Sequence, residues 1–169
     1  MAYPKIKTVT GSSTIRGLGA YAANDMLLDS TATGAAIAIQ VGDHDGDSGY
    51  ISQANLFLGG SAMTARITGF LFSVSPAGGT LMDNAANLHP VTADITSRNF
   101  IGQIDWVALS NQGSGDSHAI ATVSTSGNLP LLYTCGSGTR NIYMVPATND
   151  SVTCGTGMAI KVDFVTEQY

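Results

Sequence analysis

The chain has 169 residues, of which only 11% are charged, and its formal net charge is −5 at pH 7. An ordinary soluble domain has about 25% charged residues, so charged groups are scarce here. The negative net charge disfavours binding to the nucleic-acid backbone, and no apolar run approaches the roughly 20 residues of a membrane-spanning helix. We therefore expect one domain that binds neither nucleic acid nor a membrane.

The composition favours strands over helices. Gly is abundant, with 20 copies, whereas Glu occurs once, as Glu167. β-branched and hydroxyl side chains suit the pleated surface of a sheet, and Gly supplies the backbone conformations that tight turns need. We therefore predict an all-β domain.

The first 24 residues carry Lys5, Lys7 and Arg16 and no acid, whereas the rest of the chain holds all twelve acids. This asymmetry predicts an N-terminal arm, residues 1–19, that binds an acidic partner through these three cations. An ordinary first strand with solvated lysines is the alternative. The opening MAYPKIKTVTG has no apolar h-region of a signal peptide, so we expect synthesis in the cytoplasm.

Segments with strand character follow one another between clusters of turn residues. The clearest is MAIKVDFV, in which every second residue from Met158 to Phe164 is apolar, the period of a half-buried strand. The other segments are residues 35–41, 49–58, 65–74, 99–109, 119–124, 129–135 and 141–147. Roughly eight to ten short strands at this spacing are typical of a sandwich or barrel. We predict a single antiparallel β-sandwich, jelly-roll-like, over residues 20–169.

Three aspartates, Asp43, Asp45 and Asp47, stand at alternate positions in the segment VGDHDGDSGYI. An EF-hand calcium loop needs Gly at its sixth position and Glu at its twelfth, where this chain has Ser48 and Ala54. The segment is therefore not an EF-hand loop. Two alternatives fit the sequence: a looser calcium site built from these carboxylates and backbone carbonyls, or a hydrated loop between two strands.

No motif for catalysis stands out in the chain. The segment GSGDSHA brings Asp116, Ser117 and His118 close together in sequence, but a catalytic triad needs partners that converge from separate elements. We find no G-x-S-x-G elbow, zinc motif or Walker sequence. We therefore predict a protein without enzymatic activity and without a cofactor, apart from the calcium alternative.

Cys135 and Cys154 allow one disulfide but do not require it. Without a signal peptide, two reduced thiols are favoured, although a particle released from a cell could oxidise them later. Trp106 shares its alternation with Phe100 and Ile104, which places its ring in the core. An exposed platform for sugar binding is the alternative use of this ring.

The chain contains the segments YAANDML, GYISQANL, TARITGFLFSVSP, LMDNAAN, FIGQIDW, LPLLYTC, RNIYMVPAT and IKVDFVTEQY, which extend from about Ala20 to Tyr169. Together they resemble small virion proteins of tailed bacteriophages, in particular the capsid decoration, or cement, proteins. These segments are packing and turn patterns and include no catalytic signature. The acidic loop and the two cysteines are not part of the resemblance.

The resemblance implies a structural protein that decorates and stabilises the exterior of a phage capsid by binding the lattice of the major capsid protein. It also implies a homotrimer that is made in the host cytoplasm. The arm with Lys5, Lys7 and Arg16 would then lie against the major capsid protein and add a strand to a sheet edge. The alternative function is a calcium-assisted carbohydrate-binding module on a tail fibre or cell surface, supported by the acidic loop and Trp106.

Overall fold

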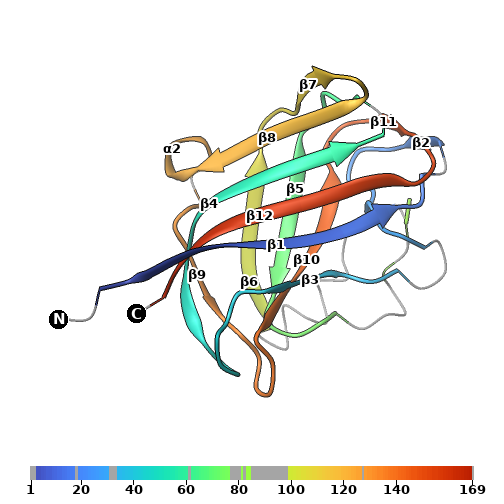
Figure 1. The fold of residues 1–169 in the computed structure, drawn as a ribbon. Helices are drawn as coiled ribbons and strands as arrows, with labels where there is room; N and C mark the ends of the chain where they lie inside the picture. The colour runs from blue at the N-terminus through green and yellow to red at the C-terminus, as the bar shows by residue number, and fades with distance from the viewer. Residues whose placement is uncertain are drawn as a thin grey trace.

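The computed structural model of the chain describes residues 3–17, 19–30, 34–60, 62–76, 81, 83–84, 99–126 and 128–168 (Figure 1). The strands are β1 (Lys5–Ile15), β2 (Gly19–Tyr21), β3 (Ile37–Gln40), β4 (Ser48–Gly59), β5 (Ile67–Phe72), β6 (Phe100–Trp106), β7 (Ser110–Gly113), β8 (Asp116–Thr122), β9 (Leu131–Thr134), β10 (Asn141–Thr148), β11 (Val152–Cys154) and β12 (Met158–Gln168). One short helix, α2 (Val123–Ser126), follows β8. No helix of the described residues has the length and apolar character to span a membrane.

Two layers of antiparallel strands form the sandwich (Figure 1). The first, which we call the β12 sheet, has the order β1-β12-β4-β8-β7, with β9 also paired to β4. The second, the β10 sheet, has the order β3-β10-β5-β6, and β2 pairs with β11 in a separate ribbon. Every pairing between these strands is antiparallel.

The strand order defines the topology. Leaving aside β2 and β11, which form the separate ribbon, and β7 and β9, which lie at the margins of the β12 sheet, successive strands cross from one sheet to the other at every step except β5 to β6. The first and last of these strands, β1 and β12, are neighbours in one sheet, and the second and second-last, β3 and β10, are neighbours in the other. This is the order of a jelly roll. The predicted fold class, an all-β antiparallel jelly-roll sandwich, is confirmed.

The main core lies between the two sheets and follows the predicted alternation. Along β12, Met158, Ile160, Val162 and Phe164 are buried, whereas Lys161 is exposed. Trp106 at the end of β6 is only 1% exposed, and its indole Nε1 donates a hydrogen bond to the carbonyl of Ala54 at 3.1 Å. The prediction of a core role for this tryptophan is confirmed.

A second apolar cluster covers the outer face of the β10 sheet. Met26 and Leu28, in the connection between β2 and β3, pack together with Leu81 and with Phe72 and Val145 of the sheet. The backbone of this cover is attached to β10, since Leu27 N donates to the carbonyl of Pro146 at 2.9 Å. The central strands of this sheet, β5 and β10, are therefore covered on both faces, whereas outward residues of the β12 sheet face solvent.

The segment that we predicted as an arm contains a strand of the sandwich. Residues Lys5–Ile15 form β1 and pair with β12 in unbroken register, from Lys5 opposite Gln168 to Ile15 opposite Met158. This arrangement corresponds to the alternative of an ordinary first strand. A domain boundary at residue 19 would divide β1 from the sheet to which it belongs. The physical reason is the alternation of β1, whose residues Val9, Gly11 and Ile15 turn toward the core.

Gly11 sets how closely β1 approaches the β10 sheet. A Cβ atom at this position would lie 2.5 Å from Cγ1 of Ile39 and 2.9 Å from Cγ2 of Ile37. We expect Gly11→Val to destabilise the fold by about 1–3 kcal/mol, because these core side chains would have to leave their rotamers. Thr8→Val, on the exposed face of the same strand, is the matched control. Chemical denaturation measures both, and a Gly11→Val protein as stable as the wild type would contradict this packing.

Candidate functional site

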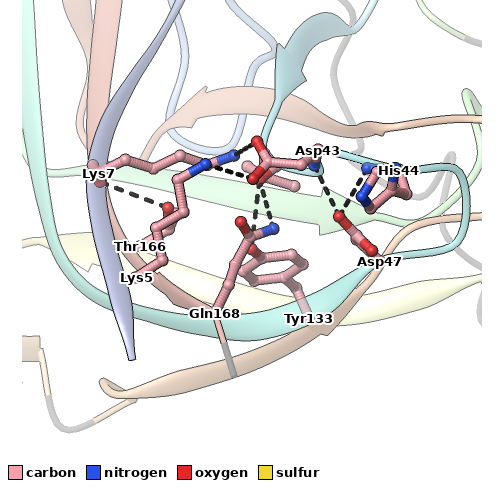
Figure 2. A network of polar contacts seen from close by, with 9 residues as sticks. Lys5, Lys7, Asp43, His44, Asp47, Tyr133, Thr166 and Gln168 are labelled. Carbon is pink, nitrogen blue, oxygen red and sulfur yellow. Dashed lines mark hydrogen bonds and ion pairs between the residues drawn. The ribbon is translucent and has the colours of Figure 1, made fainter. Parts of the chain in front are cut away.

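The acidic loop, residues 42–47, connects β3 to β4 and rests on the turn that precedes β10. The backbone N–H groups of Val41 and Gly42 donate to the carbonyl of Arg140 at 3.0 and 2.8 Å, and that of Gly46 donates to Thr139 at 3.0 Å. Figure 2 shows how the loop faces the N-terminal half of β1 and the last residues of β12. The loop is therefore held in place by its neighbours on both sides.

Asp43 binds both lysines of β1. Lys5 Nζ donates to Oδ2 at 2.5 Å and Lys7 Nζ donates to Oδ1 at 2.8 Å, so each oxygen has its own ammonium group (Figure 2). These two hydrogen bonds lower the pKa of Asp43 from 3.8 to about 2. Asp43 therefore stays ionised throughout the neutral and mildly acidic range and ties β1 to the acidic loop.

The other two aspartates have different partners. Asp47 Oδ2 accepts hydrogen bonds from the backbone N–H groups of Asp43 and His44, both at 2.7 Å. The bond from His44 is the main cause that lowers the pKa of Asp47. Asp45 accepts a hydrogen bond from Arg140 Nε at 3.3 Å. The three carboxylates thus serve three separate contacts.

The predicted calcium site would use three carboxylates that already take part in these contacts. Among the described residues, no group of three His, Cys, Asp or Glu side chains is arranged to hold a metal ion. Calcium binding by Asp43, Asp45 and Asp47 stays a prediction, and it would require Asp43 to exchange two lysines for the ion.

The three cations that we predicted for partner binding lie apart. Lys5 and Lys7 are engaged by Asp43. Arg16 follows the end of β1, at the opposite end of the strand, and its charge acts on Asp83. Ion pairs within the molecule therefore explain the positions of the two lysines. That these residues bind a partner stays a prediction.

Asp83, which the sequence analysis did not single out, fastens the cover of the β10 sheet. Its carboxylate accepts hydrogen bonds from the Tyr21 hydroxyl at 2.5 Å and from the Leu28 backbone N–H at 2.9 Å. Burial raises the pKa of Asp83, although these hydrogen bonds oppose the shift. No sequence motif signals this contact, because it joins residues more than fifty positions apart.

The GSGDSHA segment does not assemble a triad. Ser117 and His118 are consecutive residues of β8, so their side chains point to opposite faces of the sheet. Ser117 is buried and its Oγ accepts a hydrogen bond from the Met63 backbone N–H at 2.7 Å. His118 stacks on Phe57 of β4, with ring centroids 4.5 Å apart. These positions give the serine no access to the imidazole.

Phe57 lies in an open groove of about 480 Å³ on the outer face of the β12 sheet. Its ring has His118 of β8 on one side and Lys161 of β12 on the other, with the Lys161 Nζ 5.3 Å from the ring centroid. Lys161 also donates to Asp163 at 3.0 Å. Side chains of this chain thus flank the ring from both neighbouring strands.

A row of four cross-strand neighbours lies at the other end of the same face. Ile6 is opposite Glu167, Glu167 is opposite Tyr50, and Tyr50 is opposite Leu132. Directly paired residues of antiparallel strands project to the same side, so these side chains are adjacent. We call them the Ile6–Leu132 row. The sequence analysis missed it, because the row depends on the register of four strands.

Cys135 and Cys154 are free, buried thiols, so the disulfide that the sequence allowed is not formed. Cys135 N bonds to the carbonyl of Asp47, just before β4 begins, whereas Cys154 Sγ lies 3.8 Å from Met63 Sδ, beyond the end of β4. The 12 residues of β4 span roughly 35 Å, whereas a disulfide needs Cα atoms within about 7 Å. The two thiols therefore lie too far apart to pair.

We expect both thiols to react slowly with iodoacetamide at pH 8 in the folded protein. Burial raises the pKa of Cys135 and raises that of Cys154 to about 11, and only the exposed thiolate is a good nucleophile. In denaturant without reductant, both should be alkylated rapidly. The mass of the intact protein measures the labelling, and a denatured chain that takes up no label would show that a disulfide exists.

The Asp43 contact has a testable pH dependence. Asp43→Asn removes the carboxylate that binds both lysines, so we expect a lower melting temperature at pH 7. Because the pKa of Asp43 is depressed in the folded protein, its stabilisation is present above the ordinary value of 3.8 and is lost as pH falls through about 2. The difference between wild type and Asp43→Asn should therefore be constant above about pH 5 and close toward pH 2.

Asp45→Asn is the matched control for this experiment. It removes the same charge from the same loop but leaves both lysine contacts in place, and the Asp45–Arg140 pair that it breaks is longer and more exposed. We expect it to lower the melting temperature less than Asp43→Asn does. Equal melting temperatures for wild type and Asp43→Asn at pH 7 would show that the contact does not stabilise the fold.

No family model and no curated protein matches this chain. Among solved structures, the capsid of Ralstonia phage GP4 aligns with 99% of this chain and 87% of its own, at 15% identity and a TM-score of 0.46. The capsid asymmetric unit of cyanophage Pam1 aligns with 100% and 89%, at 16% identity and a TM-score of 0.35. Tomato aspermy virus aligns with 100% and 79%, at 11% identity and a TM-score of 0.31. These similarities are remote, and the proposals below rest on this chain's residues and topology.

Proposed function

We propose that this chain is a structural virion protein that decorates and stabilises the exterior of a phage capsid by binding the lattice of the major capsid protein. The observation that carries the proposal is the one-sided burial of the jelly roll. The central strands of one sheet, β5 and β10, are covered on both faces, whereas the other sheet leaves a broad face open. Such a molecule is suited to lie against a larger surface through a single face.

The fold is compatible with this role and does not by itself select it. Jelly rolls serve as viral capsid domains, and also as lectins and cupins, so function has to be argued from the surface. The resemblance of segments such as GYISQANL and RNIYMVPAT to phage decoration proteins supports the capsid role. The arrangement of Ser117 and His118 on opposite faces of β8 gives no support to a hydrolase.

The alternative, a calcium-assisted carbohydrate-binding module, loses much of its support. Trp106 is buried in the core and cannot serve as a sugar platform. The ring of Phe57 is flanked by His118 and Lys161. Asp43 of the acidic loop is paired with two lysines. A sugar would therefore find neither a free aromatic ring among these residues nor an open cluster of carboxylates.

A homotrimer on the lattice would give the attachment its strength. Three copies that bind together convert the second and third contacts into intramolecular events, so weak individual contacts add up to tight binding. Sedimentation of the purified protein measures its oligomeric state, and the proposal expects a trimer either in solution or on the shell.

The test uses phage heads from a mutant that lacks this chain. We expect purified protein to bind these heads at regular lattice positions in cryo-electron micrographs and to raise the temperature at which they release DNA. Heads that already carry the protein are the control and should take up no more. Absence of the chain from wild-type particles by mass spectrometry, together with glycan binding that a chelator abolishes, would favour the carbohydrate-binding alternative.

A further inference from the structure

We infer that this chain binds its partner through the Ile6–Leu132 row, and that the partner presents apolar side chains around a lysine or arginine. The inference rests on the proposed function, since it identifies the contact that decoration of a shell requires. It moves the attachment from the basic residues of β1 to the outer face of the β12 sheet.

The row exposes large apolar side chains in one place. Ile6 is 65% exposed, Leu132 55% and Tyr50 37%, and Val123 of α2 is 55% exposed beside them. An open groove of about 570 Å³ runs between Tyr50 and Val123, with Pro130 and Glu167 in its lining. Exposed apolar side chains that gather on one part of a face are typical of interaction sites.

The neighbouring rows of the same face are different. The row that starts at Thr10 continues through Asp163 and Asn55, and the Thr10 hydroxyl donates to the Asp163 carboxylate at 2.6 Å. The next row contains Ser12 and Lys161 beside Phe57. Two apolar side chains are exposed in those rows, Ile120 opposite Asn55 at 48% and Phe57 at 37%. The larger group, Ile6, Tyr50, Leu132 and Val123, lies at the end of the sheet where β9 joins it.

The charge of Glu167 indicates which kind of side chain the partner presents. It is the single glutamate of the chain and it lies between Ile6 and Tyr50 in the row. No ion pair of the described residues involves Glu167. Covering the apolar row would remove water from this carboxylate, which costs free energy unless an opposite charge replaces the water. Neutral N–H donors could replace that water, but a lysine or arginine also balances the charge, so we assign a cation to the centre of the partner's contact.

The described residues of a second copy of this chain are poorly suited to supply that cation. Each lysine and arginine in the described part of the chain already lies near a carboxylate of its own molecule. The pairs are Lys5 and Lys7 with Asp43, Arg66 with Asp150, Arg140 with Asp45, Lys161 with Asp163, and Arg16 near Asp83. Charge complementarity thus favours a different protein, which in the proposed function is the shell.

The variants Leu132→Ser and Glu167→Lys test the row. Both positions lie on the surface, so folding should be retained, and circular dichroism and the melting temperature verify this. Binding is measured by co-sedimentation with phage heads from the mutant that lacks this chain. We expect Leu132→Ser to weaken binding about tenfold, as truncation of an interface anchor does, and Glu167→Lys to weaken it more by repelling the partner's cation.

Two control variants make the result specific. Val107→Ser removes an apolar side chain that is 60% exposed, comparable to Leu132, but lies after β6 in the other sheet, and it should bind as the wild type does. Glu167→Gln removes the charge without reversing it and should fall between wild type and Glu167→Lys. Raising the salt concentration should weaken wild type more than Glu167→Gln, because only the former has an ion pair to screen.

The outcomes separate the two proposals. Wild-type protein that fails to bind the heads would overturn the decoration function, and the row assignment with it. Wild-type binding that Leu132→Ser and Glu167→Lys leave unchanged would overturn the row assignment alone. A wild-type oligomer in solution that Leu132→Ser dissociates would show that the row contacts a second copy, which also overturns the inference of a different, cationic partner.

Discussion

The burial of the central strands β5 and β10 on both faces is the constraint that makes the two outer faces of the sandwich different. Met26 and Leu28 can cover the sheet only because Asp83 and the backbone of β10 hold their segment against it. With that layer in place, the outer face of the β12 sheet is left as the broad strand-built surface in contact with solvent. The Ile6–Leu132 row lies on this exposed face.

The fold class could be predicted because it depends on local alternation. The period of two in β12, from Met158 to Phe164, identifies a half-buried strand without knowledge of its neighbours. The same argument placed Trp106 in the core. The segment at residues 5–15 carries two signals: its lysines suggest a charged arm, whereas Val9, Gly11 and Ile15 face the core as in a strand.

The surface sites could not be predicted, because they depend on register between strands far apart in sequence. Tyr50 and Leu132 are adjacent only because β9 pairs with the beginning of β4. Likewise, Lys5 and Lys7 count as unpaired cations when the charges of a segment are summed, yet Asp43 is 38 and 36 residues away from them. The spacing of Cys135 and Cys154 in sequence likewise gave no indication of their distance in space, because they lie at opposite ends of β4.

The position of β12 has a consequence for biosynthesis. It lies between β1 and β4, yet it follows every other strand of its sheet along the chain. While the ribosome is still translating residues 158–168, β1 has no neighbour in the layer and β4 has an open edge, and such edges invite pairing with other nascent chains. This domain must therefore complete its folding after residues 158–168 have been synthesised, and until then a chaperone would have two strands to protect.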